Sequence, residues 1–221
     1  MTPHGSTGGS RPRSLPERLY LLSYDLDKKR LDAPSSLYRH QLLRGAALVE
    51  LSLRGLVVDR GGKAARGDGP EPDDALLAGV LADVPAHRPR HWAGLLVREP
   101  GAAERTVRER LAEAGVVTVE TRRLLGVLPL RTVTPVDGAE VRLLRERVRD
   151  IVIGGDPAAA PAEDVALAVL ALEGNMAHVL TWRERRDHKR AIAALNAHFD
   201  AMVPGVRSAV RLAVANATSG G

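Results

Sequence analysis

The longest apolar stretch of the chain, residues 165–180, most constrains how the chain folds. It carries Glu173, Asn175 and His178, and it is shorter than the roughly 20 apolar residues that a membrane-spanning helix needs. We therefore interpret the stretch as a helix buried in the core of a globular protein. A helix that is apolar on every side is a buried one.

Helical periodicity and capping signals place most of the remaining chain in helices. The order Ser14-Leu15-Pro16-Glu17 has the spacing of a capping box and predicts that ordered structure begins there. Further helices are expected at 37–54, 73–84, 91–97, 99–114, 138–152, 162–181, 184–198 and 206–217.

β-structure is expected in two places only. Residues 56–59 predict a short strand, followed by a Gly-rich polar loop at 60–72. The β-branched residues from Val116 and the apolar run from Leu124 to Val133 predict a β-hairpin. The expected fold class is therefore mainly α, a single compact helical domain with a β-hairpin.

The expected domain covers residues 15–217, with a disordered tail at 1–14 and a frayed end at 218–221. The tail contains Gly, Ser, Pro and Arg but no apolar segment of the kind that a signal peptide has. Aromatic residues make up only 3% of the chain, so an aliphatic core is expected. Few side chains are available to stack on the bases of single-stranded nucleic acid. The absence of cysteine excludes disulfides, thiolate zinc sites and cysteine nucleophiles.

Basic residues are the most informative about function. The net charge is +5 and most of the cations are arginines, whose planar fork of donors fits phosphate oxygens. A genome that favours Arg codons gives the same composition, so the positions of particular arginines matter more than their number. Arg44 interrupts an apolar helix and must find a partner or a cleft. Arg105 and Arg108 share a helix face, which is either a phosphate site or a solvated face paired with neighbouring glutamates.

Motifs for catalysis and metal binding are missing. The chain has no G-x-S-x-G elbow, P-loop or G-x-G-x-x-G. His87 and His91 have helical metal-ligand spacing, but Pro89 between them favours loop histidines. His178 is interpreted as a hydrogen-bonded core histidine, and Glu50 as a buried acid or the partner of an arginine. We therefore expect a protein with no catalytic residues, no metal and no cofactor.

Three segments in register resemble the Golgi phosphoprotein 3-like family. Leu15-Pro16-Glu17-Arg18-Leu19-Tyr20-Leu21-Leu22 is similar to the family's opening helix. The run from Leu43 to Gly55, LRGAALVELSLRG, resembles its "LRG…ELALRG" helix. The run from Arg105 to Leu111 followed by Gly115-Val116-Val117 resembles its "R-x-V-R-E-R-L…G-V-L" segment. The resemblance covers residues 15–214.

This resemblance implies a single mainly helical domain with a β-hairpin and a non-catalytic function. Eukaryotic members of the family are peripheral membrane proteins that bind phosphatidylinositol 4-phosphate on the Golgi and hold the cytoplasmic tails of glycosyltransferases. The phosphate-binding arginines of the family correspond to Arg44, Arg105 and Arg108. Its hairpin, linked to membrane insertion or self-association, corresponds to a segment with Leu124, Leu125, Leu128 and Leu130.

The expected partner is therefore an anionic, phosphoinositide-like membrane lipid, with no nucleic acid and with cytoplasmic tails of other proteins or a second copy as further partners. The expected location is cytoplasmic and peripheral to the membrane. The family's pocket has a Trp shortly before the LRG motif, where the nearest aromatic residue here is Tyr38. The Ala- and Arg-rich composition is typical of an actinobacterial member.

The main alternative is a winged-helix DNA-binding regulator. Residues 107–133 run from helix through glycine to hairpin and carry arginines, as a winged helix does. No convincing recognition helix precedes the hairpin, which favours the lipid-binding interpretation. An enzyme is a third class, but no convergent set of acid, base and nucleophile can be named.

Overall fold

The computed structural model describes residues 12–124 and 128–219. Its central element is helix α2 (Arg39–Leu53), which is buried along most of its length. Helices from both halves of the chain pack around it: α1 (Leu15–Leu22), α3 (Ala75–Ala82), α4 (Trp92–Leu96), α5 (Ala102–Glu113), α7 (Ala162–Glu173) and α10 (Val206–Ser219). The expected mainly helical fold with a β-hairpin is confirmed.

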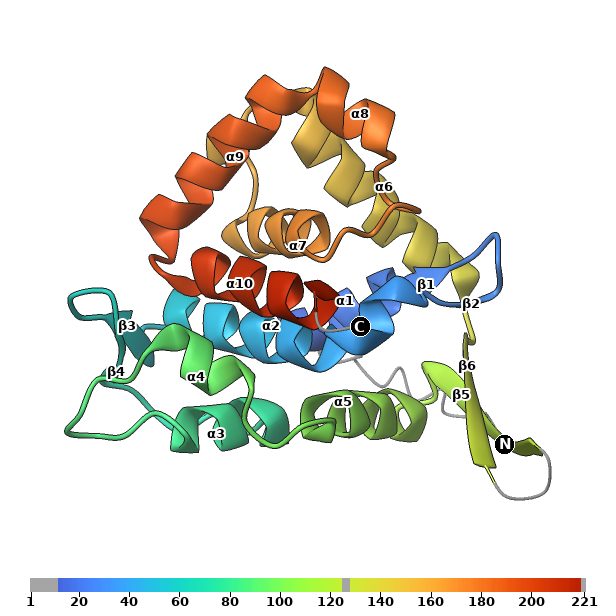
Figure 1. Ribbon diagram of the computed structural model, residues 1–221, viewed down its shortest axis with the longest axis horizontal. Coiled ribbons are helices and arrows are strands. Elements are labelled where there is room, and N and C mark those ends of the chain that lie inside the picture. Colours follow the sequence, from blue (N-terminus) through green and yellow to red (C-terminus); the bar gives the residue numbers. More distant parts are fainter. Residues whose placement is uncertain (1–11, 125–127, 220–221) are drawn as a thin grey trace, which may run out of the picture.

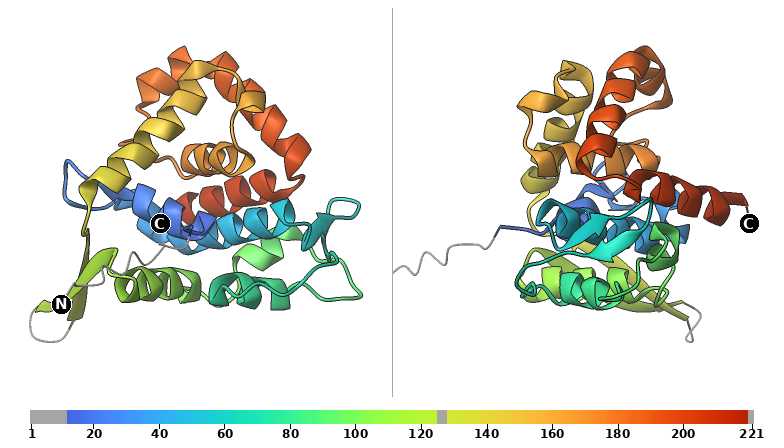
Figure 2. Two further views of the ribbon diagram at one scale, coloured as in Figure 1. Left: turned by 180° about the vertical axis from the view of Figure 1, so that it is seen from behind. Right: turned by 90° about the vertical axis from the view of Figure 1, so that its left-hand side faces the viewer.

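The helices form stacked layers (Figures 1 and 2). In the view of Figure 1, α3, α4 and α5 lie below α2, whereas α7 and α10 lie above it. A further layer above these consists of α6 (Gly138–Gly154), α8 (Trp182–Asp187) and α9 (Lys189–Met202). Two short 3-10 helices, η1 (Pro34–Leu37) and η2 (Pro157–Ala159), connect longer elements. No helix in residues 12–124 and 128–219 has the length and apolar character that crossing a membrane requires.

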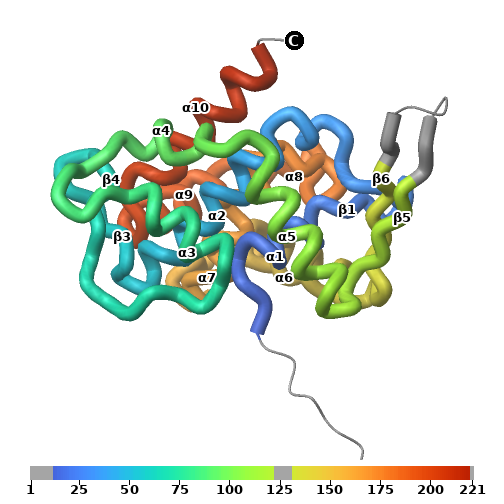
Figure 3. The backbone as a smooth tube through the Cα atoms, turned by 90° about the horizontal axis from the view of Figure 1, so that it is seen from below, coloured from blue at the N-terminus to red at the C-terminus, as the bar shows by residue number. Residues whose placement is uncertain are grey.

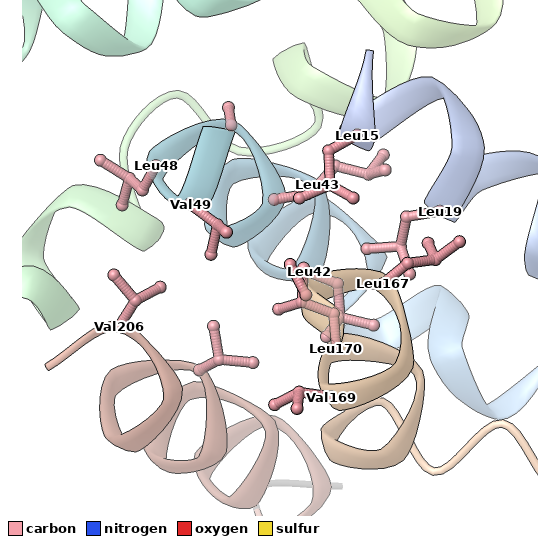
Figure 4. Packing of buried hydrophobic residues seen from close by; sticks show 14 of the residues in the cluster. Leu15, Leu19, Leu42, Leu43, Leu48, Val49, Leu167, Val169, Leu170 and Val206 are labelled. Atoms are coloured by element: carbon pink, nitrogen blue, oxygen red, sulfur yellow. The ribbon is translucent and has the colours of Figure 1, made fainter. Parts of the chain in front are cut away.

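The core is aliphatic, as the low aromatic content predicts. Leucines and valines of α2 meet those of α1, α7 and α10 in its centre (Figure 4). Gly45 of α2 lets α10 approach closely, because a Cβ at this position would lie 2.7 Å from Cγ2 of Val210. A larger side chain there would force neighbouring side chains from their preferred positions.

All strands in the described residues form two-stranded antiparallel hairpins. The two short ones pair β1 (Tyr24–Asp25) with β2 (Arg30–Leu31), and β3 (Val57–Asp59) with β4 (Ala64–Arg66). The expected strand at 56–59 is confirmed as β3, but its partner β4 lies inside the expected loop at 60–72. Gly61 and Gly62 have positive φ and close the turn between the two strands.

The long hairpin consists of β5 (Val117–Leu124) and β6 (Leu128–Pro135). It confirms the hairpin predicted from residue 116 onward, and it follows directly from α5 at one end of the molecule (Figure 3). Leu124 pairs with Leu128, and Leu130 pairs with Arg122. Leu125 lies outside the described residues, so the predicted apolar contact of the hairpin stays a prediction.

The helix expected at 162–181 is shorter than predicted. α7 ends at Glu173, and Asn175 adopts a left-handed conformation with φ of 48°. The apolar residues that follow, Met176, Val179 and Leu180, are buried from a turn segment and not from a helix. Burial thus explains their apolar character without helical periodicity. The helix expected at 184–198 is likewise two helices, α8 and α9, which meet at His188.

A second capping box begins α8. Glu184 accepts hydrogen bonds from the backbone N–H and the hydroxyl of Thr181, at 2.8 and 2.7 Å, and pairs with Arg149 of α6. The hydrogen bond from Arg149, followed by those from Thr181, lowers the pKa of Glu184 from 4.5 to about 2.

We expect this cluster to make the stability depend on pH in the acid range. A carboxyl group whose folded pKa is depressed stabilises the fold above its unfolded pKa of 4.5, and this contribution is lost as pH falls toward 2. Glu184→Gln should therefore lower the melting temperature at pH 7 and flatten its decline between pH 4.5 and 2. Thermal unfolding followed by circular dichroism across this range tests it. An unchanged acid profile in the variant would contradict the assignment.

Candidate functional site

A pocket of about 510 Å³ opens between α5, strand β6 and the segment from β2 to the start of α2. Its volume lies in the range of small-molecule sites. Four arginines and two carboxylates line it, so positive charge is in excess. We call it the arginine pocket, and its charged residues are Arg30, Arg39, Arg108, Arg131, Asp32 and Glu104.

The fold assembles the arginine pocket from four segments that are distant in sequence. Arg30 lies in β2, Arg39 begins α2, Arg108 lies in the middle of α5, and Arg131 lies in β6. Strands β2 and β6 pack together and form one wall of the pocket. Helices α2 and α5, which are also in contact, form the other wall. The pocket therefore depends on the tertiary fold and not on one local motif.

Arg39 is fixed at the base of the pocket. The residue is 5% exposed. It donates to Glu104 Oε1 at 3.0 Å, to the carbonyl of Asp32 at 2.5 Å and to Ser35 Oγ at 2.9 Å. Its Nε is buried and has no hydrogen-bond partner within residues 12–124 and 128–219. One donor of a held guanidinium is thus left for a ligand or water.

The other three arginines are available to an anion. Arg30 and Arg131 are exposed and Arg108 is half-buried. None of the three pairs with a carboxylate in the described part of the chain. Unpaired guanidinium groups that converge on one concave surface can make charge-assisted hydrogen bonds to a phosphate.

Tyr20 of α1 adds a buried hydroxyl to the pocket lining. The residue is 1% exposed, and its hydroxyl has no hydrogen-bond partner in the region that the structure describes. Burial raises the pKa of Tyr20 to about 12 with help from Glu104, although the charges of Arg108 and Arg39 oppose the shift, as does the side chain of Arg108, which lies near the hydroxyl without forming a well-aligned hydrogen bond. Tyr20 is therefore a neutral hydroxyl at physiological pH, able to donate to an anion.

The structure brings only one of the three arginines predicted from sequence to this pocket, namely Arg108. Arg105 lies one turn earlier on α5 and is exposed, outside the lining. Arg44 is 3% exposed and is held elsewhere. Its Nε donates to the carbonyl of Leu95 and its Nη2 to Asp83, both at 2.6 Å. A phosphate-binding role for Arg44 and Arg105 stays a prediction.

Sequence reasoning missed Arg30, Arg39, Arg131 and Tyr20 as pocket residues. Arg39 had a detectable signal, because an arginine directly after an aromatic residue at the start of an apolar helix needs a partner. Tyr38, the aromatic nearest to the family's Trp position, is not part of the lining. Its side chain is buried and its hydroxyl donates to the carbonyl of Gly174 at 3.1 Å.

The remaining candidates have structural partners. Glu50 is buried, accepts from the backbone N–H of Leu15 at 2.7 Å and pairs with Arg54, so it is both a buried acid and an arginine partner. The Nε2 of His178 lies 2.8 Å from the carbonyl of Leu22, in agreement with a hydrogen-bonded core histidine. Within the described residues, no group of His, Asp and Glu is arranged to hold a metal.

A second cavity of about 500 Å³ between α6 and the start of α7 has the opposite charge. Glu146, Asp150, Asp156 and Asp164 line it together with a single cation, Arg147. Acidic side chains repel phosphate, so the arginine pocket is the candidate for an anionic ligand.

The fold defines a mainly helical protein with a β-hairpin, and the arginine pocket is its candidate site for an anion. A family model described as Golgi phosphoprotein 3 (GPP34) matches residues 15–216. The chain belongs to this family, which is of a non-enzymatic, phosphatidylinositol 4-phosphate-binding type. No curated protein matches the chain significantly. Nothing in these comparisons favours the DNA-binding alternative.

Proposed function

We propose that this protein binds anionic phosphate head groups of membrane lipids, of the phosphatidylinositol 4-phosphate kind, in the arginine pocket. One observation carries the proposal. The pocket combines three arginines without carboxylate partners with two buried polar atoms that lack a hydrogen bond, Arg39 Nε and Tyr20 Oη. Leaving buried donors unsatisfied costs roughly 1–3 kcal/mol each, and a phosphate supplies acceptors.

A phosphomonoester suits this arrangement because it carries close to two negative charges near neutral pH. The excess of arginines over carboxylates in the pocket balances that charge. Arg105, exposed one turn from Arg108, is in a position to contact an adjacent phosphate of a lipid layer.

The neighbouring hairpin supports a membrane location. Arg131, Thr132 and Val133 of β6 form part of the pocket wall, and the same strand continues to the apolar segment with Leu128 and Leu130. One head group seldom gives stable attachment, and a second apolar or basic contact is normally needed. The predicted apolar hairpin contact supplies one.

The proposed protein acts by binding and not by catalysis, at the cytoplasmic surface of a membrane. Its further partners are the cytoplasmic tails of other proteins or a second copy of the chain. Both proposals rest on family membership.

Sedimentation with vesicles tests the proposed function. The protein is mixed with phosphatidylcholine vesicles that contain phosphatidylinositol 4-phosphate, phosphatidylglycerol or no anionic lipid, and separately with duplex DNA. We expect it to sediment with the phosphoinositide vesicles most strongly. Equal binding to all anionic vesicles would contradict a specific phosphate site, because attraction to negative charge alone would explain it. Binding to DNA alone would overturn the proposal.

Tyr20→Phe should weaken vesicle binding without lowering the free energy of unfolding. Removing a buried hydroxyl without a partner should leave the free protein as stable as before or more stable, by up to about 1–3 kcal/mol. Loss of one neutral donor to phosphate should weaken vesicle binding by about fivefold, or about 1 kcal/mol. Urea unfolding and vesicle titration measure the two effects. A variant that is less stable but binds unchanged would show that the hydroxyl serves the fold.

A further inference from the structure

Trp182 is the one exposed aromatic side chain of the protein. Its exposure is 69%, whereas the other five aromatic residues, Tyr20, Tyr24, Tyr38, Trp92 and Phe199, are buried. All the other aromatic side chains therefore belong to the core. A single exposed indole needs no functional explanation by itself, so it is the exposed cations beside it on α8 and the start of α9 that point to a function.

Exposed cations follow this indole along the chain. Arg183, Arg186, Lys189 and Arg190 are all exposed on α8 and the start of α9, with Asp187 as the exposed acid among them. The guanidinium carbon of Arg186 lies 5.4 Å from the centre of the indole ring, within cation–π range. We call these four cations and Trp182 the tryptophan patch.

Hydrogen bonds with neighbouring elements hold α8, which carries the patch, in place. Arg185, on the inner side of α8, donates to the carbonyls of Leu172 and Leu180, at 2.9 and 3.2 Å. Arg149 of α6 pairs with Glu184 and donates to the carbonyl of Val179 at 2.8 Å. The inner residues of α8 thus hold the helix to the body while Trp182, Arg183 and Arg186 remain outside.

The segment before α8 packs against the part of the chain that forms the arginine pocket. His178 contacts the carbonyl of Leu22, and its Nδ1 lies 3.9 Å from Asp32 of the pocket. The hydroxyl of Tyr38 donates to the carbonyl of Gly174. In Figures 1 and 2, α8, the β1–β2 turn and the β5–β6 hairpin lie in the same half of the molecule.

We propose that the tryptophan patch is a second membrane contact, in which the indole enters the boundary between head groups and acyl chains and the cations bind anionic lipid. This inference rests on the proposed function. An amphipathic indole prefers that boundary, and basic residues are attracted to an anionic surface. The residues that dominate binding in protein–protein interfaces lie in well-packed pockets that are shielded from water. The neighbours of Trp182 along α8 and α9 are instead exposed cations. A lipid surface is therefore the better match.

Intrinsic fluorescence tests this contact directly because the chain has two tryptophans. Trp92→Phe leaves Trp182 as the only emitter. With vesicles of phosphatidylinositol 4-phosphate in brominated phosphatidylcholine, we expect a blue shift and quenching of Trp182. Trp92 donates to Asp59 at 3.1 Å, so this variant can lose stability. The wild-type protein then serves instead, because Trp92 is only 5% exposed.

A charge-reversal pair completes the test. Arg183→Glu/Arg186→Glu should weaken vesicle binding about tenfold or more. Arg60→Glu/Lys63→Glu makes the same change in net charge on exposed residues of the β3–β4 turn, at the opposite end of the molecule in Figure 1, and should have a smaller effect. Vesicle binding without quenching of Trp182, or equal effects of both pairs, would overturn this inference and leave the proposed function intact. No vesicle binding by the wild-type protein would overturn both.

Discussion

Arg44→Ala is expected to lower the free energy of unfolding by about 3–5 kcal/mol, because it removes two buried hydrogen bonds of a charged donor, each contributing roughly 1.5–3 kcal/mol. Arg44 joins α2 to Asp83 at the end of α3 and to Leu95 of α4. Its guanidinium contacts Asp83 Oδ2 and the carbonyl of Leu95, both at 2.6 Å, and is 3% exposed.

The matched control is Arg98→Ala. Arg98 also pairs with Asp83, its Nε lying 2.5 Å from Oδ1, but its side chain is 42% exposed. Exposed ion pairs contribute roughly 0–1 kcal/mol, so this variant should lose little stability. Urea unfolding followed by circular dichroism compares the two variants under the same conditions.

The result also decides between two roles for Arg44. The resemblance of the LRG motif implies that this arginine binds phosphate, whereas its contacts in the fold are those of a structural residue. A variant as stable as the wild type that no longer binds vesicles would support the phosphate role and contradict the structural one. A destabilised variant that still binds vesicles when folded at low temperature would support the structural role.

The fold was predictable from the sequence wherever local signals decided it. The capping box at Ser14 forms as expected, with the backbone N–H of Ser14 donating to Glu17 at 2.9 Å. The β-branched run from Val116 likewise marked the hairpin. Local signals failed beyond Glu173, because apolar character reports burial and Met176, Val179 and Leu180 are buried without being helical.

The candidate site was only partly predictable, because its residues come together through tertiary structure. Arg108 was predicted from the resemblance of its segment to the family's R-x-V-R motif, and it lines the pocket. Arg30 and Arg131 lie on strands that are separated by about half the chain, and no local pattern indicates that β2 and β6 meet. For Arg44, the sequence motif does not reveal that Asp83 and the carbonyl of Leu95 already bind its guanidinium.

Arg108→Gln/Arg131→Gln should weaken binding to phosphatidylinositol 4-phosphate vesicles by about 100-fold. Each hydrogen bond from a charged donor contributes about 1.5–3 kcal/mol, and losing two of them corresponds to at least two powers of ten in affinity. Neither side chain has a carboxylate partner in the described residues, and Arg131 is exposed. The free energy of unfolding should therefore change by less than about 0.5 kcal/mol.

Arg105→Gln is the matched control, because it removes an exposed arginine of the same helix that does not line the arginine pocket. We expect it to weaken vesicle binding by fivefold or less, an effect of about 1 kcal/mol for one cation at an anionic surface. Calorimetric titration with a soluble inositol phosphate should distinguish the two positions further. Substitutions in the pocket should weaken binding of this ligand, whereas substitution of a residue that contacts only the lipid layer should not. If Arg105→Gln abolishes binding while the double variant retains it, phosphate binds on the outer face of α5 and the arginine pocket is not the site.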